Sequence, residues 1–196
     1  MDATDVTVRS VRSVGPDTIA IELEAPPEFD ALPGHFVLLR ATVDGEEVSR
    51  HYTLSSPGVD DTFEITVGVD PTGDLSPWLA DREPGDAVTV EGPFGTVVYD
   101  PETDGDVVAI GGGPGVGPAV AVGEAAATAG NSVSVVYEDD QPVHEARLAA
   151  LASLPKDSRG SSFDVRDAKR LSPPSADRWT CSRSNPNSSN SAGLPA

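Results

Sequence analysis

Arg50-His51-Tyr52-Thr53-Leu54-Ser55-Ser56 is the stretch around which the rest of the chain is organised. It places a guanidinium, an aromatic ring and several hydroxyls within a few residues of one another. Alternate side chains of an extended strand share a face, so Arg50, Tyr52 and neighbouring hydroxyls could contact a single ligand. A guanidinium pairs well with phosphate, a ring can stack, and hydroxyls can hydrogen-bond. The stretch therefore indicates a ligand site, and an ordinary edge strand is the alternative interpretation.

Short runs that alternate apolar and polar residues flank this stretch on both sides. They are typical of half-buried antiparallel strands, and turn signals separate them. Strands are expected at residues 6–14, 18–24, 35–40, 47–54, 62–67 and 88–91. Residues 75–80 are expected to form a short helix before the last of these strands. Several short strands of this kind predict a small β-barrel.

The pattern changes class after residue 100. Val107-Val108-Ala109-Ile110 is a continuous apolar run, which predicts a strand buried on both faces. A glycine-rich turn follows at 111–118, and then an alanine-rich helix that ends near Ala129. A second strand is expected at 132–137 and a second helix at 145–154. The strand–helix–strand–helix order predicts a parallel sheet, which binds ligands at the carboxyl ends of its strands.

The chain is strongly acidic, and its charge is unevenly distributed. Residues 1–155 contain six Lys and Arg against 28 Asp and Glu, whereas residues 156–196 contain seven against four. The acidic part argues against nucleic acid as a partner, because phosphates repel such a surface. It favours adaptation to high salt, which screens the self-repulsion, and an ordinary acidic enzyme is the alternative.

Residues 156–196 also differ from the rest in composition. They contain ten serines and no periodic apolar pattern, which predicts a low-complexity, disordered tail. Two origins stay open for this segment: a natural flexible tail, and a reading-frame shift that replaced the native C-terminus.

Other features limit the class of protein. No apolar run approaches the roughly 18 residues that span a membrane, and the N-terminus lacks the plan of a signal peptide. Cys181 is the single cysteine, which excludes an intramolecular disulfide and a cysteine-ligated iron–sulfur cluster. His35 and His51 have no third ligand in sight, so no metal site is expected. A soluble, cytoplasmic protein is the prediction.

Taken in order, several motifs resemble those of the ferredoxin–NADP reductase superfamily. Pro33-Gly34-His35-Phe36-Val37 is similar to the family's Pro-Gly-x-Phe strand, and Arg50-His51-Tyr52-Thr53 to its Arg-x-Tyr-Ser/Thr flavin signature. Residues 73–79 resemble the Gly-x-x-Ser segment that receives the flavin pyrophosphate. Residues 92–95 resemble the barrel's closing turn, and 111–118 the Gly-Gly-x-Gly-x-x-Pro nucleotide turn.

The resemblance covers roughly residues 5–154 and implies a β plus α/β fold. Residues 1–100 would form a six-stranded antiparallel Greek-key flavin-binding barrel, and residues 101–155 a partial parallel-sheet nucleotide-binding domain. The second part is partial because the family's sheet normally continues to a Cys-Gly-Pro turn beside the flavin. Thr180-Cys181-Ser182 has the cysteine without the Gly-Pro, so Cys181 is not placed at the flavin.

The resemblance also assigns roles to the flavin strand. Arg50 would pair with a flavin phosphate, Tyr52 would stack against the isoalloxazine ring, and Thr53 would hydrogen-bond near the flavin N5. Tyr52 and Thr53 are thus the predicted catalytic residues, and His51 joins the predicted cofactor-binding set.

A second flavin segment consists of Gly73, Leu75 and Ser76, which would hold the pyrophosphate through a hydroxyl and backbone N–H groups. A plain helix cap is the alternative role for Ser76. FAD is the expected cofactor, with FMN as the alternative, because both offer a phosphate and a ring.

The nucleotide turn would approach a nicotinamide dinucleotide closely, because glycine has no side chain. The residues expected to bind the dinucleotide are Gly112, Gly113, Gly115 and Pro118. Pro114 departs from the family's Thr or Ser and removes an N–H donor. Glu138-Asp139-Asp140 follows the second strand, and carboxylates there repel the 2′-phosphate of NADPH. NADH is therefore preferred over NADPH.

Together these features predict a flavin-dependent oxidoreductase that passes electrons from NAD(P)H through FAD to a separate acceptor, such as a redox protein. A flavin-carrying electron-transfer subunit is the second hypothesis, motivated by Pro114 and the missing cluster cysteines. A damaged gene product with little activity is the third.

Overall fold

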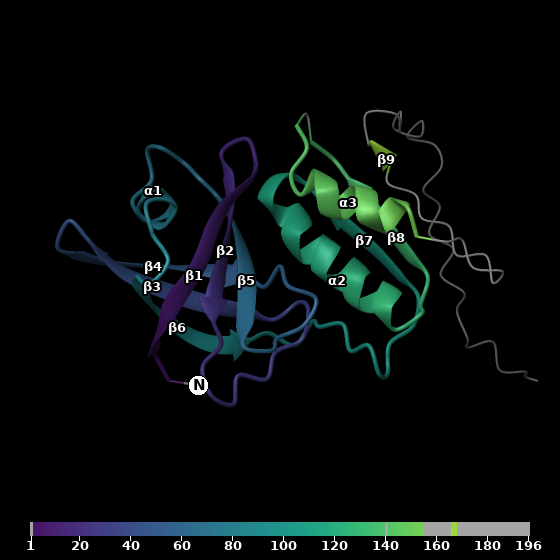
Figure 1. The fold of residues 1–196 in the computed structure, drawn as a ribbon, viewed down its shortest axis with the longest axis horizontal. Helices are drawn as coiled ribbons and strands as arrows, with labels where there is room; N and C mark the ends of the chain where they lie inside the picture. Colours follow the sequence, from purple (N-terminus) through teal and green to yellow (C-terminus); the bar gives the residue numbers. More distant parts are fainter. Residues whose placement is uncertain (1, 140, 155–165, 168–196) are drawn as a thin grey trace, which may run out of the picture.

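The structure, a computed structural model, describes residues 2–139, 141–154 and 166–167. The predictions for the tail at 156–196, including Cys181, lie outside the described residues apart from the short strand at 166–167. A six-stranded antiparallel sheet and a three-stranded parallel sheet organise the described residues (Figure 1).

The six antiparallel strands form a barrel-like sheet, which confirms the expectation from the alternating runs. They are β1 (Thr4–Gly15), β2 (Thr18–Glu24), β3 (Phe36–Val43), β4 (Glu46–Thr53), β5 (Thr62–Gly68) and β6 (Ala87–Phe94). Their order in the sheet is β4-β3-β6-β1-β2-β5, and α1 (Leu75–Ala80) lies between β5 and β6 in sequence. The sheet curls but does not close fully. Its end strands are β4 and β5, and they meet at an isolated bridge between Leu54 and Ile65 and not along a continuous ladder of hydrogen bonds.

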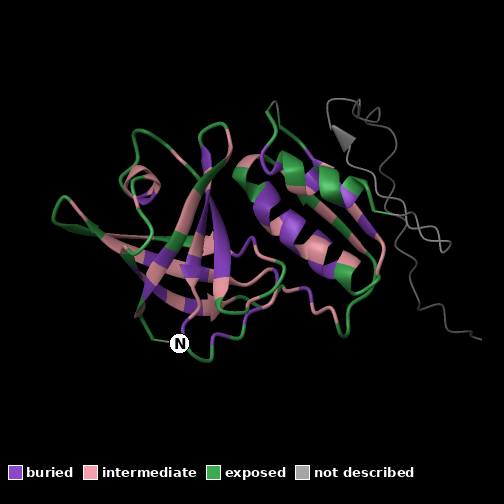
Figure 2. Cartoon of the chain, viewed as in Figure 1, coloured by how far each residue is buried: buried purple, intermediate pink, exposed green. Residues whose placement is uncertain are grey.

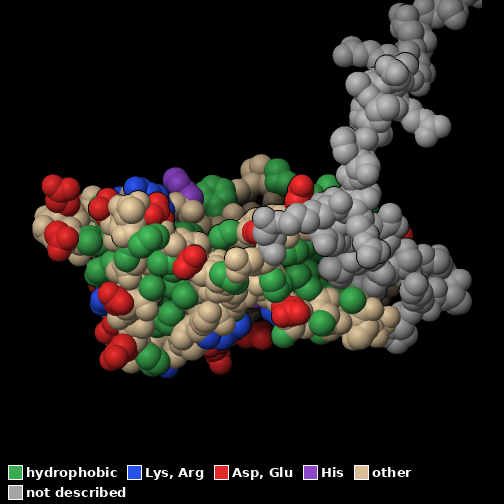
Figure 3. Space-filling view, turned by 90° about the horizontal axis from the view of Figure 1, so that it is seen from above, with side chains coloured by type: hydrophobic (Ala, Val, Ile, Leu, Met, Phe, Trp, Pro, Cys, Tyr) green, Lys and Arg blue, Asp and Glu red, His purple; other side chains and the backbone are tan. Residues whose placement is uncertain are grey.

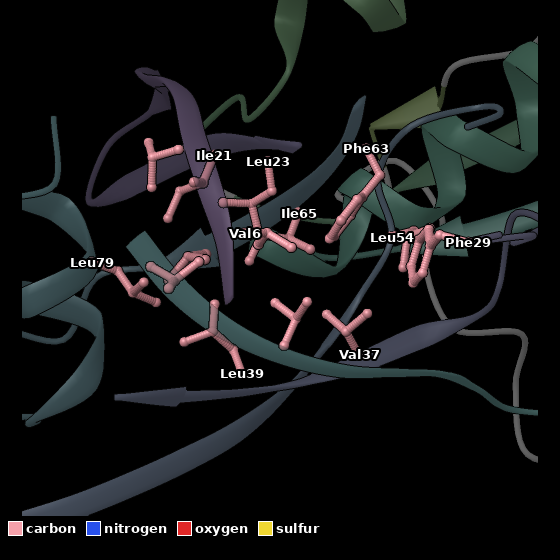
Figure 4. Close-up of a cluster of buried hydrophobic side chains, with 14 of the residues drawn as sticks. Val6, Ile21, Leu23, Phe29, Val37, Leu39, Leu54, Phe63, Ile65 and Leu79 are labelled. Atoms are coloured by element: carbon pink, nitrogen blue, oxygen red, sulfur yellow. The ribbon is translucent and has the colours of Figure 1, made fainter. Parts of the chain in front are cut away.

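A hydrophobic core fills the inner face of this sheet, because alternate strand residues point to the same side. Its fully buried side chains include Ile21, Leu23, Val37, Leu39, Leu54, Phe63 and Ile65 (Figure 4). Phe29 and Phe63 stack with 4.8 Å between ring centroids, and α1 adds Leu75 and Leu79. Burying one such side chain stabilises the fold by roughly 1.5–3 kcal/mol.

The second sheet is parallel and carries its helices on one face. Its strands are β7 (Val107–Gly111), β8 (Val133–Tyr137) and β9 (Arg166–Asp167), in the order β7-β8-β9. A 3₁₀ turn, η1 (Gly113–Gly115), leads into α2 (Val116–Thr128), and α3 (Glu145–Ala152) follows β8. Both helices lie over the same face of the sheet in Figure 1, and α2 is the more deeply buried of the two in Figure 2.

One prediction for this sheet is wrong: β7 is not buried on both faces. Val107 and Ala109 pack against the core beneath the helices, whereas Val108 and Ile110 are 70% and 75% exposed. Within the described residues, β7 is an end strand and both helices cover the opposite face. The face of β7 that carries Val108 and Ile110 therefore has no covering layer among the described residues.

Candidate functional site

The predicted flavin strand, β4, lies at one end of the barrel sheet and pairs in register with β3. Tyr52 is opposite Val37, and Thr53 is opposite Phe36. No other described strand extends a ladder along the far edge of β4, which meets β5 through the bridge at Leu54. A ligand can therefore lie along this edge.

The side chains of β4 divide between its two faces, as strand alternation requires. Tyr52 packs against the barrel core beside buried Leu54, whereas buried Ser55 lies against α2. Strand alternation places Thr53 on the Ser55 side. A ligand that contacts both Tyr52 and Thr53 must therefore lie along the strand edge.

Arg50 is the cation of this strand, and it has no carboxylate partner among the described residues. Its Nη1 donates to the Ser49 carbonyl oxygen at 2.8 Å, and its side chain is exposed. The other arginines whose side chains the structure describes each pair with an acid: Arg9, Arg12, Arg40, Arg82 and Arg147. Burial raises the pKa of the neighbouring Tyr52 phenol, and the Arg50 charge opposes that shift. Arg50 is therefore available to an anion such as phosphate.

His51 lies on the exposed part of β4 and touches an aromatic pair. Its ring meets Phe36 edge-on with 5.3 Å between centroids, and Phe36 in turn lies 5.7 Å from Phe94 of β6. The part of the chain that the structure describes holds no cluster of three or more metal-ligating side chains. A role for His51 in cofactor binding stays a prediction.

The predicted pyrophosphate segment forms the loop before α1 and the first turn of that helix. Ser76 Oγ accepts a hydrogen bond from the Asp70 N–H at 3.0 Å, so it ties the loop together rather than capping the helix. Asp74 occupies the N-cap position and makes no side-chain cap bond. The Gly73 N–H donates to the Asp70 carbonyl at 3.0 Å. Leu75 is 2% exposed in the barrel core, which leaves only its backbone for a ligand.

The glycine-rich turn contains glycines of two kinds. A Cβ added to Gly111 or Gly112 would lie 2.8 Å from a backbone atom. At Gly112 that atom is the Glu138 carbonyl oxygen. Gly113 has a φ of +51°, a left-handed conformation that suits glycine. Gly115 has a φ of −65° and no atom within 4 Å of an added Cβ. The fold itself therefore does not require glycine at Gly115, whereas a closely approaching ligand would.

Helix α2 brings this turn against the end of the flavin strand. An added Cβ on Gly117 would lie 2.3 Å from Thr66 Oγ1 and 3.0 Å from Ser55 Cβ, so only glycine allows this approach. Ser55 is two residues beyond Thr53. Pro118 lies in the first turn of α2, where backbone N–H groups lack partners within the helix. The structure thus brings together the predicted flavin segment and the predicted nucleotide turn, which lie far apart in the sequence.

A buried polar network at this contact escaped prediction from sequence. Arg147 of α3 donates to the Ser55 carbonyl oxygen at 2.7 Å, to Glu64 at 3.0 Å, and to Glu124 at 2.5 and 2.9 Å. Ser55 Oγ donates to Glu64 at 2.8 Å. Arg147 is the single Lys or Arg in the segment 83–155, and that isolation is the signal that could have marked it.

Two open clefts flank the contact between the two sheets. One of about 390 Å³ lies at the glycine turn, and its lining includes Gly113, Pro114 and Asp139. The other, of about 630 Å³, lies between the 55–64 segment and the C-terminal half of α2, and no predicted cofactor residue lines it. The first cleft is at the carboxyl end of the parallel sheet, where such sheets bind ligands, and it is the candidate nucleotide site.

A family model and several known proteins match large parts of the chain. A family model described as the oxidoreductase FAD-binding domain matches residues 5–99. The glycine betaine monooxygenase reductase subunit of Chromohalobacter salexigens is 40% identical over 104 residues, which cover 52% of this chain and 28% of that protein. A Mus musculus protein described as NADH-cytochrome b5 reductase-like is 29% identical over 118 residues, which cover 59% and 37%. The chain spans about a third of the length of these relatives.

Solved structures share both parts of the fold. A cytochrome P450 reductase from Amycolatopsis has a TM-score of 0.69 at 26% identity, covering 84% of this chain and 51% of that one. A ferredoxin NADP⁺ reductase from Neisseria gonorrhoeae with bound FAD and NADP has a TM-score of 0.68, covering 87% and 76%. Its 20% identity makes this second likeness one of fold alone.

Proposed function

We propose, from the match of residues 5–99 to the oxidoreductase FAD-binding domain, that the chain is an NAD(P)H-dependent flavin reductase of the ferredoxin–NADP reductase superfamily. Residues 1–100 would hold FAD, and residues 101–155 would form a partial dinucleotide-binding domain. Electrons would pass to a separate acceptor, as the description of one relative as a monooxygenase reductase subunit suggests. A redox protein is the proposed acceptor.

Arg50 carries the proposal, because it is the described arginine without an acid partner and it lies on the open end strand of the barrel. Its charge would pair with a flavin phosphate. The partly buried Tyr52 ring and the Thr53 hydroxyl would flank the flavin ring along the strand edge, while Gly73 and Ser76 would border the pyrophosphate. These groups fit FAD, which would supply the hydride-accepting chemistry when bound.

The glycine turn is the proposed dinucleotide site, through Gly112, Gly113, Gly115 and Pro118. An added Cβ on Gly113 would lie 3.3 Å from Asp139 Oδ2, so a carboxylate borders the turn. Asp17 and Asp70 line the same cleft. Three carboxylates around one cleft disfavour an additional phosphate, which supports NADH over NADPH.

The acid excess of residues 1–155 supports adaptation to high salt, because screening removes the repulsion among carboxylates. Acidic side chains are spread over the face shown in Figure 3. No helix in the described part of the chain is long and apolar enough to cross a membrane. A cytoplasmic location and the absence of a nucleic-acid partner stay predictions.

The absorption spectrum of the purified protein tests the proposal. After incubation with FAD in high salt and removal of free cofactor, the protein should retain a flavin spectrum. Arg50→Gln should retain much less. Arg40→Gln is the matched control, because Arg40 on the neighbouring strand pairs with Glu91 at 2.9 Å and should not contact the flavin. Colourless wild-type protein would contradict flavin binding.

A flavin-carrying electron-transfer subunit is the second candidate function, and the exposed face of β7 favours it. Val108 and Ile110 expose apolar surface on the parallel sheet, as expected where a partner docks. Anaerobic addition of NADH separates the two functions, because it bleaches the flavin absorbance of a reductase and leaves that of a carrier unchanged.

A further inference from the structure

Arg147 joins the two parts of the chain at the end of the flavin strand. Its guanidinium holds the Ser55 carbonyl oxygen at 2.7 Å and Glu64 Oε1 at 3.0 Å, both on the barrel side. It also holds both carboxylate oxygens of Glu124, at 2.9 and 2.5 Å. Glu124 lies on α2, the helix that the glycine turn begins. One side chain therefore ties α2 and α3 to the barrel.

The geometry of this link is well defined, because its groups are largely buried and bonded to one another. The side chains of Arg147 and Glu64 are 19% and 12% exposed. Ser55 Oγ donates to the same Glu64 oxygen that Arg147 contacts. A planar guanidinium presents its donors in a rigid fork at fixed angles, whereas a lysine ammonium is a compact point charge on a flexible stem.

We propose that Arg147 is a positioning residue for hydride transfer, which fixes the glycine turn relative to Thr53 without touching either cofactor. This inference rests on the proposed function. Ser55, whose carbonyl Arg147 holds, is two residues from Thr53, and α2 packs on the same Ser55 through Gly117. Movement of α2 would therefore change the distance between the dinucleotide site and the flavin site. A misplacement of about 1 Å can slow a reaction by about 100-fold.

Arg12 offers a matched control, because it pairs with the same carboxylate from within the barrel. It comes from β1 and contacts Glu64 Oε2, whereas Arg147 contacts Oε1. Removing Arg12 takes a positive charge from Glu64 but breaks no link between the barrel and the helices. The two arginines thus separate a local effect on Glu64 from an effect on the placement of α2.

The experiment compares Arg147→Lys, Arg147→Met and Arg12→Met in the full chain loaded with FAD. Anaerobic stopped-flow absorbance measures the limiting rate of flavin bleaching at saturating NADH. Both Arg147 variants should lose at least about tenfold in this rate, because alignment is disturbed. Their FAD affinity and half-saturating NADH concentration should change less than about threefold, because binding groups are intact. Arg12→Met should keep the wild-type rate.

A second readout does not depend on activity. Amide hydrogen exchange of the flavin-free protein should become faster in residues 55–64 and 116–128 of the Arg147 variants, and stay at the wild-type level in Arg12→Met. If Arg147→Met fails to fold, the test rests on Arg147→Lys, which keeps the positive charge and loses the planar fork. The same bleaching and exchange results then support or overturn the inference.

Wild-type bleaching rates in the folded Arg147 variants would overturn the inference. An equal loss in Arg12→Met would also overturn it, since the effect would then belong to Glu64. Unchanged hydrogen exchange in the Arg147 variants would have the same consequence. Failure of NADH to bleach the wild-type flavin is a different result: it contradicts the proposed function, while the exchange comparison still tests the link.

Discussion

Replacing His144 with glutamine is expected to flatten the pH dependence of stability below neutrality. His144 precedes α3, is 4% exposed, and places Nε2 2.8 Å from Thr66 Oγ1 of the barrel. Burial, followed by the positive charges of Arg147 and Arg12, lowers its pKa from 6.5 to about 4. The ring therefore stays neutral in the folded protein at pH values where the unfolded chain binds a proton.

The difference in proton binding sets the sign and the size of the effect. Between pH 6.5 and about 4 the unfolded state binds more protons, so the free energy of unfolding falls as the pH falls. Above this window both states carry a neutral ring, and below it both are protonated. Each pKa unit corresponds to about 1.4 kcal/mol, so His144 accounts for a loss of about 3 kcal/mol across the window.

Urea unfolding of the flavin-free protein at several pH values between about 7 and about 4 measures this loss. His144→Gln keeps a hydrogen-bonding side chain without the titrating ring, and should remove most of the loss. Carboxylates contribute equally to the pH dependence of unfolding in both proteins, so their contribution cancels when the two are compared. The same slope in wild type and His144→Gln would refute the burial of this ring beside two arginines.

Other predictions concern the cofactor sites and the surface. Arg50→Gln should weaken FAD binding by about 10- to 100-fold, because a charged hydrogen bond contributes about 1.5–3 kcal/mol; FAD titration measures this, and a loss as large in Arg40→Gln would contradict it. Gly117→Ala should lower the free energy of unfolding in urea by about 1–3 kcal/mol, because the added methyl overlaps Thr66. An unchanged urea midpoint would contradict the close approach of α2 to the barrel. Gly115→Ala should keep wild-type stability and weaken NAD⁺ binding in calorimetry, and unweakened binding would remove this position from the dinucleotide site. Thermal unfolding should shift to higher temperature between about 0.1 M and about 1 M salt, because the screening length falls from about 10 to about 3 Å; a constant or falling midpoint would argue against high-salt adaptation.

The barrel was predictable from sequence because apolar residues alternate with polar ones along its strands. The run at 88–91 shows this, because β6 buries Val88 and Val90 while Thr89 and Glu91 are only partly buried. The prediction that 107–110 is buried on both faces was wrong, because a continuous apolar stretch does not show whether one or both faces of a strand are covered. Exposed Val108 and Ile110 show that helices cover one side alone in the described structure.

The predicted flavin motif is visible in the sequence because its residues are consecutive. The isolation of Arg50 could not be predicted, since it depends on which carboxylates the fold brings near β4, and none of the described ones pairs with Arg50. The Arg147 network joins residues 83 and 92 positions apart. No local pattern encodes such contacts, which form only when α3 packs on the barrel.

Anaerobic titration of the FAD-loaded protein with NADH in high salt tests the central claim most directly. The expected result is loss of the visible flavin absorbance as NADH is added, and its recovery when an artificial electron acceptor is supplied. Flavin absorbance that persists in excess NADH would contradict the assignment of the chain as a reductase.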